Sequence, residues 1–207
     1  MHQPDTTPRR SLYFDYRVHP AAPPAQGESA QAPVVVVGAG PIGLVLAIDL
    51  ARRGVRTVLL TAEQQLSEGS RAIVFTRRSM EILQQVGADR AVTAQGLPWR
   101  FGTSHYRGQP VFRLEAPQDV HDRFHPMINL QQPLLEQALV DLAQQQPLLE
   151  LRWGHKVTGV GCDADGATLE VDTPQGPYVQ RAGWVAACDG ARSALRRLQG
   201  LELEGDS

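Results

Sequence analysis

Cysteine is scarce in this sequence, because only Cys162 and Cys188 occur among its 207 residues. A disulfide framework is therefore not expected, and a reducing compartment such as the cytoplasm is the predicted location. The spacing of cysteine and histidine matches no zinc site, so no metal is predicted. A convincing acid/base dyad or Ser/His/Asp set is also missing, so no catalytic side chain is predicted.

Long apolar runs are missing as well. The longest apolar stretch, over 33–50, is broken by glycines and a proline, and about 18 uninterrupted apolar residues would be needed to span a membrane. The N-terminus is polar and rich in proline, without the apolar centre of a secretory signal. A net charge of −2 gives no indication of nucleic acid or of a charged membrane surface. The length fits one globular domain, or one domain and part of another.

The most informative pattern that is present is G-x-G-x-x-G, formed by Gly38, Gly40 and Gly43. Gly38 permits a tight turn, Gly40 lets the backbone approach a diphosphate, and Gly43 lets a helix pack closely on a sheet. Pro41 and Ile42 begin that helix, whose free N–H groups and partial positive charge attract phosphates. The sequence therefore predicts a dinucleotide site, with a purely structural glycine turn as the alternative.

The segments around this turn predict a parallel βαβ unit, with strands over 33–37 and 56–60 and a helix over 41–53. Glycines alone do not separate FAD from NAD, since both contain an adenosine diphosphate. An acid normally ends the second strand and holds the adenosine ribose, but this sequence has Thr61 there. Glu63 lies two residues later and is either a second ribose ligand or a solvated loop acid.

The rest of the chain alternates between helix and strand patterns. Thr76 predicts the cap of a helix over 77–86 that ends at Gly87, and a second helix is predicted over 132–145. Short strands are predicted at 100–106, 110–115, 148–153, 155–162, 167–173, 178–183 and 184–190, the last of them buried. Turns at Asp165-Gly166 and Gln175-Gly176 join three of these strands into a meander.

Residues 1–32 form an N-terminal extension without a clear period. It is either a disordered tail or an arm that lays Tyr13, Phe14 and Tyr16 on the surface of the domain over 33–207.

Three stretches resemble the flavin-dependent aromatic hydroxylases of the para-hydroxybenzoate hydroxylase type: EGSRAIVFTRRSMEILQQVG (68–87), INLQQPLLEQAL (128–139) and VAACDGARSALRR (185–197). The likeness is closer to the 3-(3-hydroxyphenyl)propionate hydroxylase-like branch. It implies a Rossmann-like α/β FAD-binding fold with a parallel sheet, crossing helices and an inserted antiparallel β-meander. It also implies a flavoenzyme that uses FAD, NADH or NADPH, and O2 to hydroxylate a small phenolic substrate.

The resemblance implies further cofactor contacts at Arg71, Gln132, Val157, Asp189 and Gly190. Arg71 would approach the ribityl and diphosphate groups of FAD, where a guanidinium suits the charge, and would lie within reach of Asp189. Gln132 would hydrogen-bond FAD, Val157 would lie near the adenine through its backbone, and Asp189-Gly190 matches the Asp-Gly motif of the family. The plainer alternatives are an exposed arginine, an ordinary first-turn glutamine and a helix-capping aspartate.

The sequence departs from the family in two ways. Thr61 stands where the family has an acid, and the chain ends at Ser207 where family members continue into a substrate domain and a second cofactor motif. We therefore expect an incomplete FAD-binding domain that is inactive alone and is completed by a downstream segment or a second chain. The alternatives are a non-catalytic nucleotide-binding fragment or subunit, and another FAD- or NAD-dependent dehydrogenase.

Overall fold

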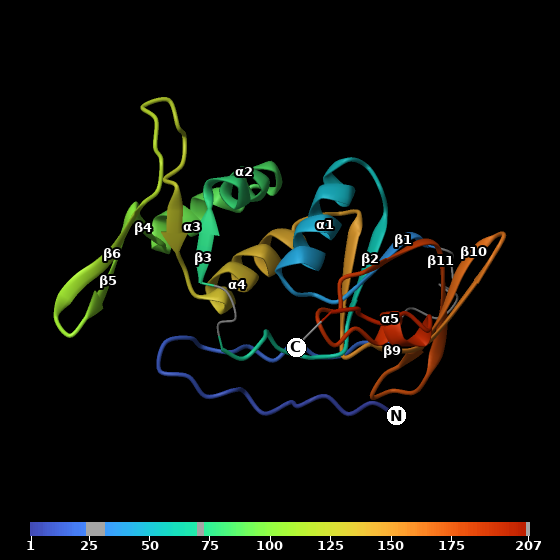
Figure 1. Ribbon diagram of the computed structural model, residues 1–207. Helices are drawn as coiled ribbons and strands as arrows, with labels where there is room; N and C mark the ends of the chain where they lie inside the picture. Colours follow the sequence, from blue (N-terminus) through green and yellow to red (C-terminus); the bar gives the residue numbers. More distant parts are fainter. Residues whose placement is uncertain (24–31, 70–72, 206–207) are drawn as a thin grey trace.

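The central feature of the fold is a six-stranded sheet with the order β8-β2-β1-β11-β10-β9 (Figure 1). The structure, a computed structural model, describes residues 1–23, 32–69 and 73–205. Four neighbouring strands are parallel, namely β8 (Leu149–Trp153), β2 (Thr57–Thr61), β1 (Ala32–Val37) and β11 (Tyr178–Ala187). The predicted parallel sheet is therefore confirmed.

Helices cover one face of this sheet. Helix α1 (Pro41–Arg52) follows β1 directly, and α4 (Gln132–Ala143) packs beside it. Leu44 and Ile48 of α1 and Leu139 of α4 are fully buried together with Val36 of β1. Burial of such aliphatic side chains stabilises the layer by roughly 1.5–3 kcal/mol each.

The antiparallel strands β9 (Lys156–Asp163) and β10 (Gly166–Asp172) extend the sheet beyond β11. Strand β9 contacts β2, although three strands lie between them in the sheet order, so the sheet curls back on itself. Leu169 and Val171 of β10 thereby pack with Val35 and Val58 in a second apolar core. The short helix α5 (Ala194–Leu198) closes this side through Leu195. Strands β9, β10 and β11 are the predicted antiparallel β-meander.

The middle of the chain contains α2 (Arg77–Val86) with the predicted ends. The Thr76 hydroxyl accepts a hydrogen bond from the Ser79 amide, and Gly87 ends the helix with φ +85°. The predicted strands at 100–106 and 110–115 form the β-hairpin of β5 (Phe101–Tyr106) and β6 (Gln109–Glu115).

Four short elements of this middle region were not predicted. They are α3 (Asp89–Gln95) and the strands β3 (Val74–Thr76), β4 (Leu97–Trp99) and β7 (Met127–Asn129). The three strands form a small antiparallel sheet in which β7 is central. Each has only three residues, which is too short for an alternating pattern to show in the sequence.

Strand β11 corrects two expectations. Residues 178–183 and 184–190 were predicted as separate strands, but Tyr178–Ala187 is continuous. Gly183 lies within this continuous strand. A Cβ there would lie 3.0 Å from the Pro33 carbonyl oxygen, so the glycine permits the close approach of β1. The second half was also predicted to be buried, whereas Trp184 is 78% exposed.

The N-terminal segment of residues 1–23, called the arm below, lies against the domain (Figure 1). Tyr16 is buried, and Phe14 packs on the main core with its ring 4.8 Å from that of Tyr16. The arm interpretation is therefore right for these two rings and wrong for Tyr13, which is 76% exposed. Residues 24–31 lie outside the described part of the chain.

Candidate dinucleotide site

The glycine turn joins β1 to α1 at the edge of the sheet where the parallel strands end. Gly38 has φ +105°, and its amide donates to the Leu60 carbonyl of β2 over 2.8 Å. Gly40 is the N-cap of α1, and no side chain accepts a hydrogen bond at this cap. The first amides of α1 therefore stay open to an anionic ligand, since the first four N–H groups of a helix have no partner within it.

The three glycines of the turn are required for different reasons. A Cβ on Gly38 would lie 2.4 Å from the Cys188 carbonyl oxygen, and one on Gly43 would lie 1.9 Å from the Gly38 carbonyl oxygen. A Cβ on Gly40 would meet nothing within 4 Å in the described chain, and Gly40 has an ordinary φ of −75°. Packing explains Gly38 and Gly43, whereas the open space beside Gly40 fits the close approach of a ligand.

Asp189 lies beside this turn at the end of β11. The Cys188 amide donates to the Val37 carbonyl over 2.8 Å, and the Gly38 Cβ position lies 2.8 Å from the Asp189 Cα. The Asp189 Oδ2 accepts from the amides of Ala194 and Leu195, so the expected helix-capping role is present. The other oxygen, Oδ1, is buried without a hydrogen-bond partner among the described residues. A buried acceptor without a partner is costly, and a ligand hydroxyl would satisfy it.

The residues next to Asp189 add little reactivity. Gly190 has φ +80°, which lets the chain turn sharply after the aspartate. Burial first, and then the charge of Asp189, raise the pKa of the Cys188 thiol. Cys188 thus stays a protonated side chain of the core, as a packing role requires.

Thr61 and Glu63 follow the neighbouring strand β2 at the same edge. The Thr61 carbonyl accepts the His155 amide over 2.7 Å. The Glu63 side chain is 52% exposed and its Oε2 lies 3.3 Å from the Arg9 guanidinium of the arm. Both residues therefore lie at the sheet edge that carries the glycine turn, and the Glu63 carboxylate is turned toward the arm. Their ribose contacts stay predictions.

The helix α4 begins with Gln132, which is buried. Its Nε2 donates to the Glu136 Oε1 over 2.7 Å, and the Glu136 Oε2 accepts from the Ser67 amide. The side chain of Gln132 is thus directed along α4, toward the contact of Glu136 with the loop after β2. Arg71 lies outside the described residues, so its predicted contact with FAD and its predicted pairing with Asp189 stay predictions.

Val157 is in the interior of the fold. Its side chain is 5% exposed and belongs to the second apolar core, while its backbone pairs with Val171 of β10. Any adenine contact would therefore involve the backbone, and the contact itself stays a prediction.

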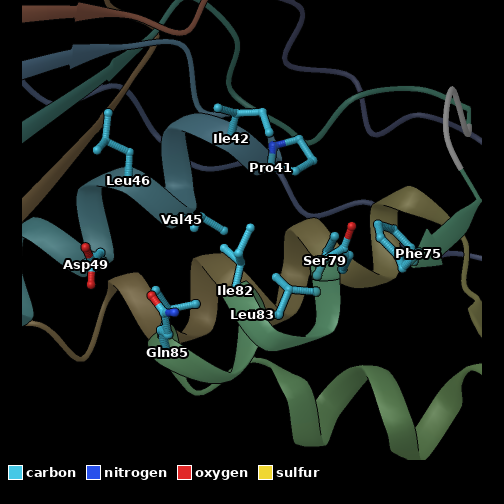
Figure 2. A pocket seen from close by; sticks show the side chains of 12 residues that line it. Pro41, Ile42, Val45, Leu46, Asp49, Phe75, Ser79, Ile82, Leu83 and Gln85 are labelled. Carbon is cyan, nitrogen blue, oxygen red and sulfur yellow. The ribbon is translucent and has the colours of Figure 1, made fainter. Parts of the chain in front are cut away.

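An apolar groove between α1 and α2 was not predicted (Figure 2). Its volume is about 440 Å³, and its lining is mostly aliphatic. Ile42 is among the residues that line this groove and is 73% exposed, and Pro41 lies beside it at the start of α1. Helix α1 is apolar almost all round, which is typical of a helix covered on every side. The groove thus marks a face of α1 that the described residues leave open.

A buried polar cluster after β8 was also missed. The His155 Nδ1 lies 2.8 Å from the Tyr178 hydroxyl, and its Nε2 lies 2.9 Å from the Ala22 carbonyl of the arm. Arg152 hydrogen-bonds both Tyr178 and Glu150. Burial, more than any charge, lowers the pKa of His155. A neutral ring that donates from Nε2 and accepts at Nδ1 satisfies both contacts.

Within residues 1–23, 32–69 and 73–205, no group of three or more His, Cys, Asp and Glu side chains is arranged to hold a metal ion. In the same ranges no helix has the length and apolar character needed to cross a membrane.

The parallel sheet, the glycine turn and the open helix N-terminus together define a dinucleotide-binding α/β domain. Residues 31–207 match the family described as FAD binding domain. The chain belongs to this FAD-binding family.

Curated relatives carry named activities. The chain is 31% identical over 172 residues to a 3-(3-hydroxy-phenyl)propionate/3-hydroxycinnamic acid hydroxylase of Mycolicibacterium smegmatis. This alignment covers 83% of this chain and 31% of that protein. It is 33% identical over 178 residues to a para-nitrophenol 4-monooxygenase of a Pseudomonas species, covering 83% and 43% respectively. The chain thus spans about a third to two fifths of the length of these relatives.

Solved structures of flavin-dependent monooxygenases have a similar fold. The p-nitrophenol 4-monooxygenase of Pseudomonas putida superposes with a TM-score of 0.80 at 32% identity, over 85% of this chain and 45% of that one. The flavin-dependent monooxygenase PieE, solved with FAD and substrate, superposes with a TM-score of 0.76 at 30% identity, over 85% and 33%. The implied FAD-binding α/β fold is therefore confirmed.

Proposed function

We propose that this chain is the FAD-binding part of a monooxygenase that hydroxylates a small phenolic compound with O2 and NADH or NADPH. The observation that carries the proposal is the glycine turn, where Gly40 is open to a ligand and Asp189 keeps a buried acceptor beside it. The names of the relatives support the aromatic substrate class. Bound FAD would supply the redox and oxygen chemistry, while the protein supplies binding and orientation.

The described residues would hold mainly the adenosine diphosphate half of FAD. The amides of Ile42 and Gly43, at the open start of α1, would donate to the diphosphate. The Thr61 hydroxyl would hydrogen-bond the adenosine ribose without the added strength of a charged acceptor. The Asp189 Oδ1 would accept from a hydroxyl of the cofactor. These roles agree with the places of the residues around one edge of the sheet.

Arg71, Gln132, Val157 and Gly190 have supporting roles in this proposal. Arg71 would add positive charge beside the diphosphate. Gln132 would contribute through the N-terminal end of α4, Val157 through its backbone next to the adenine, and Gly190 by letting the chain turn away after Asp189. Glu63 would act from the rim of the site, since its carboxylate is paired with Arg9.

We also propose that further polypeptide completes the enzyme, either downstream in the same chain or as a second chain. Ile42 in the groove and Trp184 on β11 are exposed apolar side chains on the helix-covered side of the sheet. In the part of the chain that the structure describes, Gly183–Ala187 pairs with β1 on one side and with no strand on the other. A strand beside β11 and an apolar helix on α1 would cover these surfaces, and relatives are two to three times as long.

Binding measurements with the 207-residue chain test the proposal. We expect FAD to bind, ADP to compete with it, and FMN to compete poorly because FMN lacks the adenosine. We expect hydroxylation of phenols with NADH or NADPH to be at least a thousandfold slower than typical turnover of about 10 per second. Absence of binding by both FAD and ADP would overturn the proposal.

Two alternatives predict other outcomes in the same assay. A nicotinamide-dependent dehydrogenase would bind NAD more tightly than FAD. A non-catalytic nucleotide-binding subunit would bind FAD but would stay inactive after the completing polypeptide is supplied.

We propose a cytoplasmic location for the protein, because Cys162 and Cys188 are both free and Cys162 is exposed.

A further inference from the structure

The loop over 62–69 follows β2 and leaves the sheet at the edge that carries the glycine turn. Predicted cofactor contacts lie in and around this loop. Thr61 precedes it, Glu63 is its second residue, and Arg71 follows it in the sequence. The loop contains two adjacent glutamines, Gln64 and Gln65, which are 5% and 2% exposed. Buried amides in a surface loop are unusual, since polar side chains are buried only when their hydrogen bonds are satisfied.

Three hydrogen bonds join the side-chain amide of Gln65 to the arm. Its Nε2 donates to the carbonyl oxygens of Asp5 and Thr7, each over 3.0 Å, and its Oε1 accepts from the Arg9 amide over 3.0 Å. The arm backbone thus surrounds this one amide. Because the donors and acceptors of a primary amide are distinct, this arrangement fixes the register of residues 5–9 against the loop.

The arm then returns along the other side of the loop. The His19 amide donates to the Gln64 carbonyl over 2.7 Å, and the Gln64 Nε2 donates to the His19 carbonyl over 2.8 Å. The Tyr16 hydroxyl donates to the Ser67 carbonyl, and the His19 ring stacks on Trp153 at 4.2 Å. Figure 1 shows the arm alongside the loop over 62–69.

The arm lies outside the matched family range, which begins at residue 31. A loop that binds a ligand loses affinity when it must first be ordered, because the ordering reduces conformational entropy. The arm removes that loss in advance by holding the loop in one conformation. Arg9 also pairs with Glu63, so the arm sets the direction of the acid nearest to the predicted ribose position.

We propose that the arm is a working part of the FAD site and that Gln65 is its positioning residue. Gln65 acts through the loop: it holds residues 62–69 in the conformation that receives the adenosine diphosphate half of FAD. This inference rests on the proposed function and adds a role for the two stretches of the arm that contact the loop, residues 5–9 and 16–19.

The test compares three variants of the full 207-residue chain. Gln65→Met keeps the length and volume of the side chain but removes the amide, Gln65→Ala also removes the volume, and Leu12→Ala changes an arm residue that is 93% exposed. Affinities for FAD and ADP are measured by titration calorimetry at a temperature where all variants are folded. In the ligand-free proteins, amide chemical shifts are recorded for Thr61, Glu63 and Gly40.

We expect Gln65→Met to raise the Kd of both FAD and ADP about tenfold, since it removes the three hydrogen bonds between Gln65 and the arm and frees the loop. The amides of Thr61 and Glu63 should shift, that of Gly40 should not, and Leu12→Ala should change nothing. A merely structural or space-filling role predicts instead that Gln65→Met lowers the melting temperature or changes nothing, with the Kd unchanged. That result overturns the inference alone. Failure of the unsubstituted chain to bind FAD and ADP overturns the proposed function as well.

Discussion

The glycine turn and the loop over 62–69 lie at the same edge of the sheet but are held in different ways. The turn is fixed by backbone contacts, since the Gly38 amide bonds Leu60 and the Cβ positions of Gly38 and Gly43 are filled by backbone atoms. The loop is fixed by the side-chain amides of Gln64 and Gln65, bonded to the arm. The turn is thus held within the family fold, whereas the loop is held by arm residues outside the matched range.

The largest effect is expected at the turn from Gly43→Ala. The new Cβ would lie 1.9 Å from the Gly38 carbonyl oxygen, which is backbone and cannot rotate away. We expect the free energy of unfolding to fall by more than the ~1–3 kcal/mol typical of an overpacked core. Urea unfolding followed by circular dichroism measures this. Unchanged stability would show that α1 does not need its close approach to β1.

The loop half is tested by two substitutions of Tyr16. Tyr16→Ala removes a buried ring and should lower the free energy of unfolding by about 3 kcal/mol. Tyr16→Phe keeps the ring but loses the hydrogen bond to the Ser67 carbonyl, and should cost about 1 kcal/mol. Tyr13→Ala is the control, since Tyr13 is 76% exposed and its truncation should change stability by less than about 0.5 kcal/mol. Equal effects at both tyrosines would contradict the docked arm.

Gly40→Ala separates the folding and binding roles of the turn. Nothing described lies within 4 Å of the new Cβ, and φ −75° suits alanine, so stability should be unchanged. The Cβ would instead occupy the space of the diphosphate, and we expect the Kd of FAD to rise about tenfold or more. Calorimetric titration beside a thermal melt measures both quantities. A folded Gly40→Ala protein with normal FAD affinity would mean that the diphosphate lies elsewhere.

The smallest expected effect is a pH dependence of stability at His155, which contacts the Ala22 carbonyl near the end of the arm. Burial lowers the pKa of His155 below its usual value of 6.5. The unfolded chain therefore binds more protons than the folded chain between these two pKa values. The stabilisation by neutral His155 is complete above about pH 6.5 and is lost as the pH falls from there toward the folded pKa. Burial also lowers the pKa of His19, which acts in the same direction.

Thermal melts across this pH range test that statement. The melting temperature should decrease on acidification, and His155→Gln should make the decrease shallower while an amide still reaches the Ala22 carbonyl. His105→Gln in the exposed β5–β6 hairpin serves as the matched control and should leave the slope unchanged. If His155→Gln and His105→Gln give the same slope of melting temperature against pH, His155 does not cause the loss of stability in acid.

The regions held by local patterns were the ones that the sequence predicted. The valines of β1, the cap at Thr76 and the left-handed Gly87 each act within a few residues, and the structure has all three as expected. Strands β4 and β7 were missed because they exist only through pairing between Leu97 and Asn129, which are far apart in the chain.

The same reasoning applies to the candidate site. The glycine pattern and Asp189 were found because a turn and a motif are visible in a short stretch. Gln65 was not found, since a glutamine in a polar loop is indistinguishable from a solvated one until the arm folds against it. The exposed side of α1 was missed because an apolar helix predicts burial, not which neighbour covers it.

The most direct test of the account is the position of the adenosine diphosphate. Titration of the isotope-labelled chain with ADP, followed by amide chemical shifts, would locate it. We predict that the largest shifts occur at Gly38–Gly43 and at the amide of Asp189, with smaller shifts at Thr61. Shifts confined to the groove between α1 and α2, with an unperturbed glycine turn, would contradict the central claim.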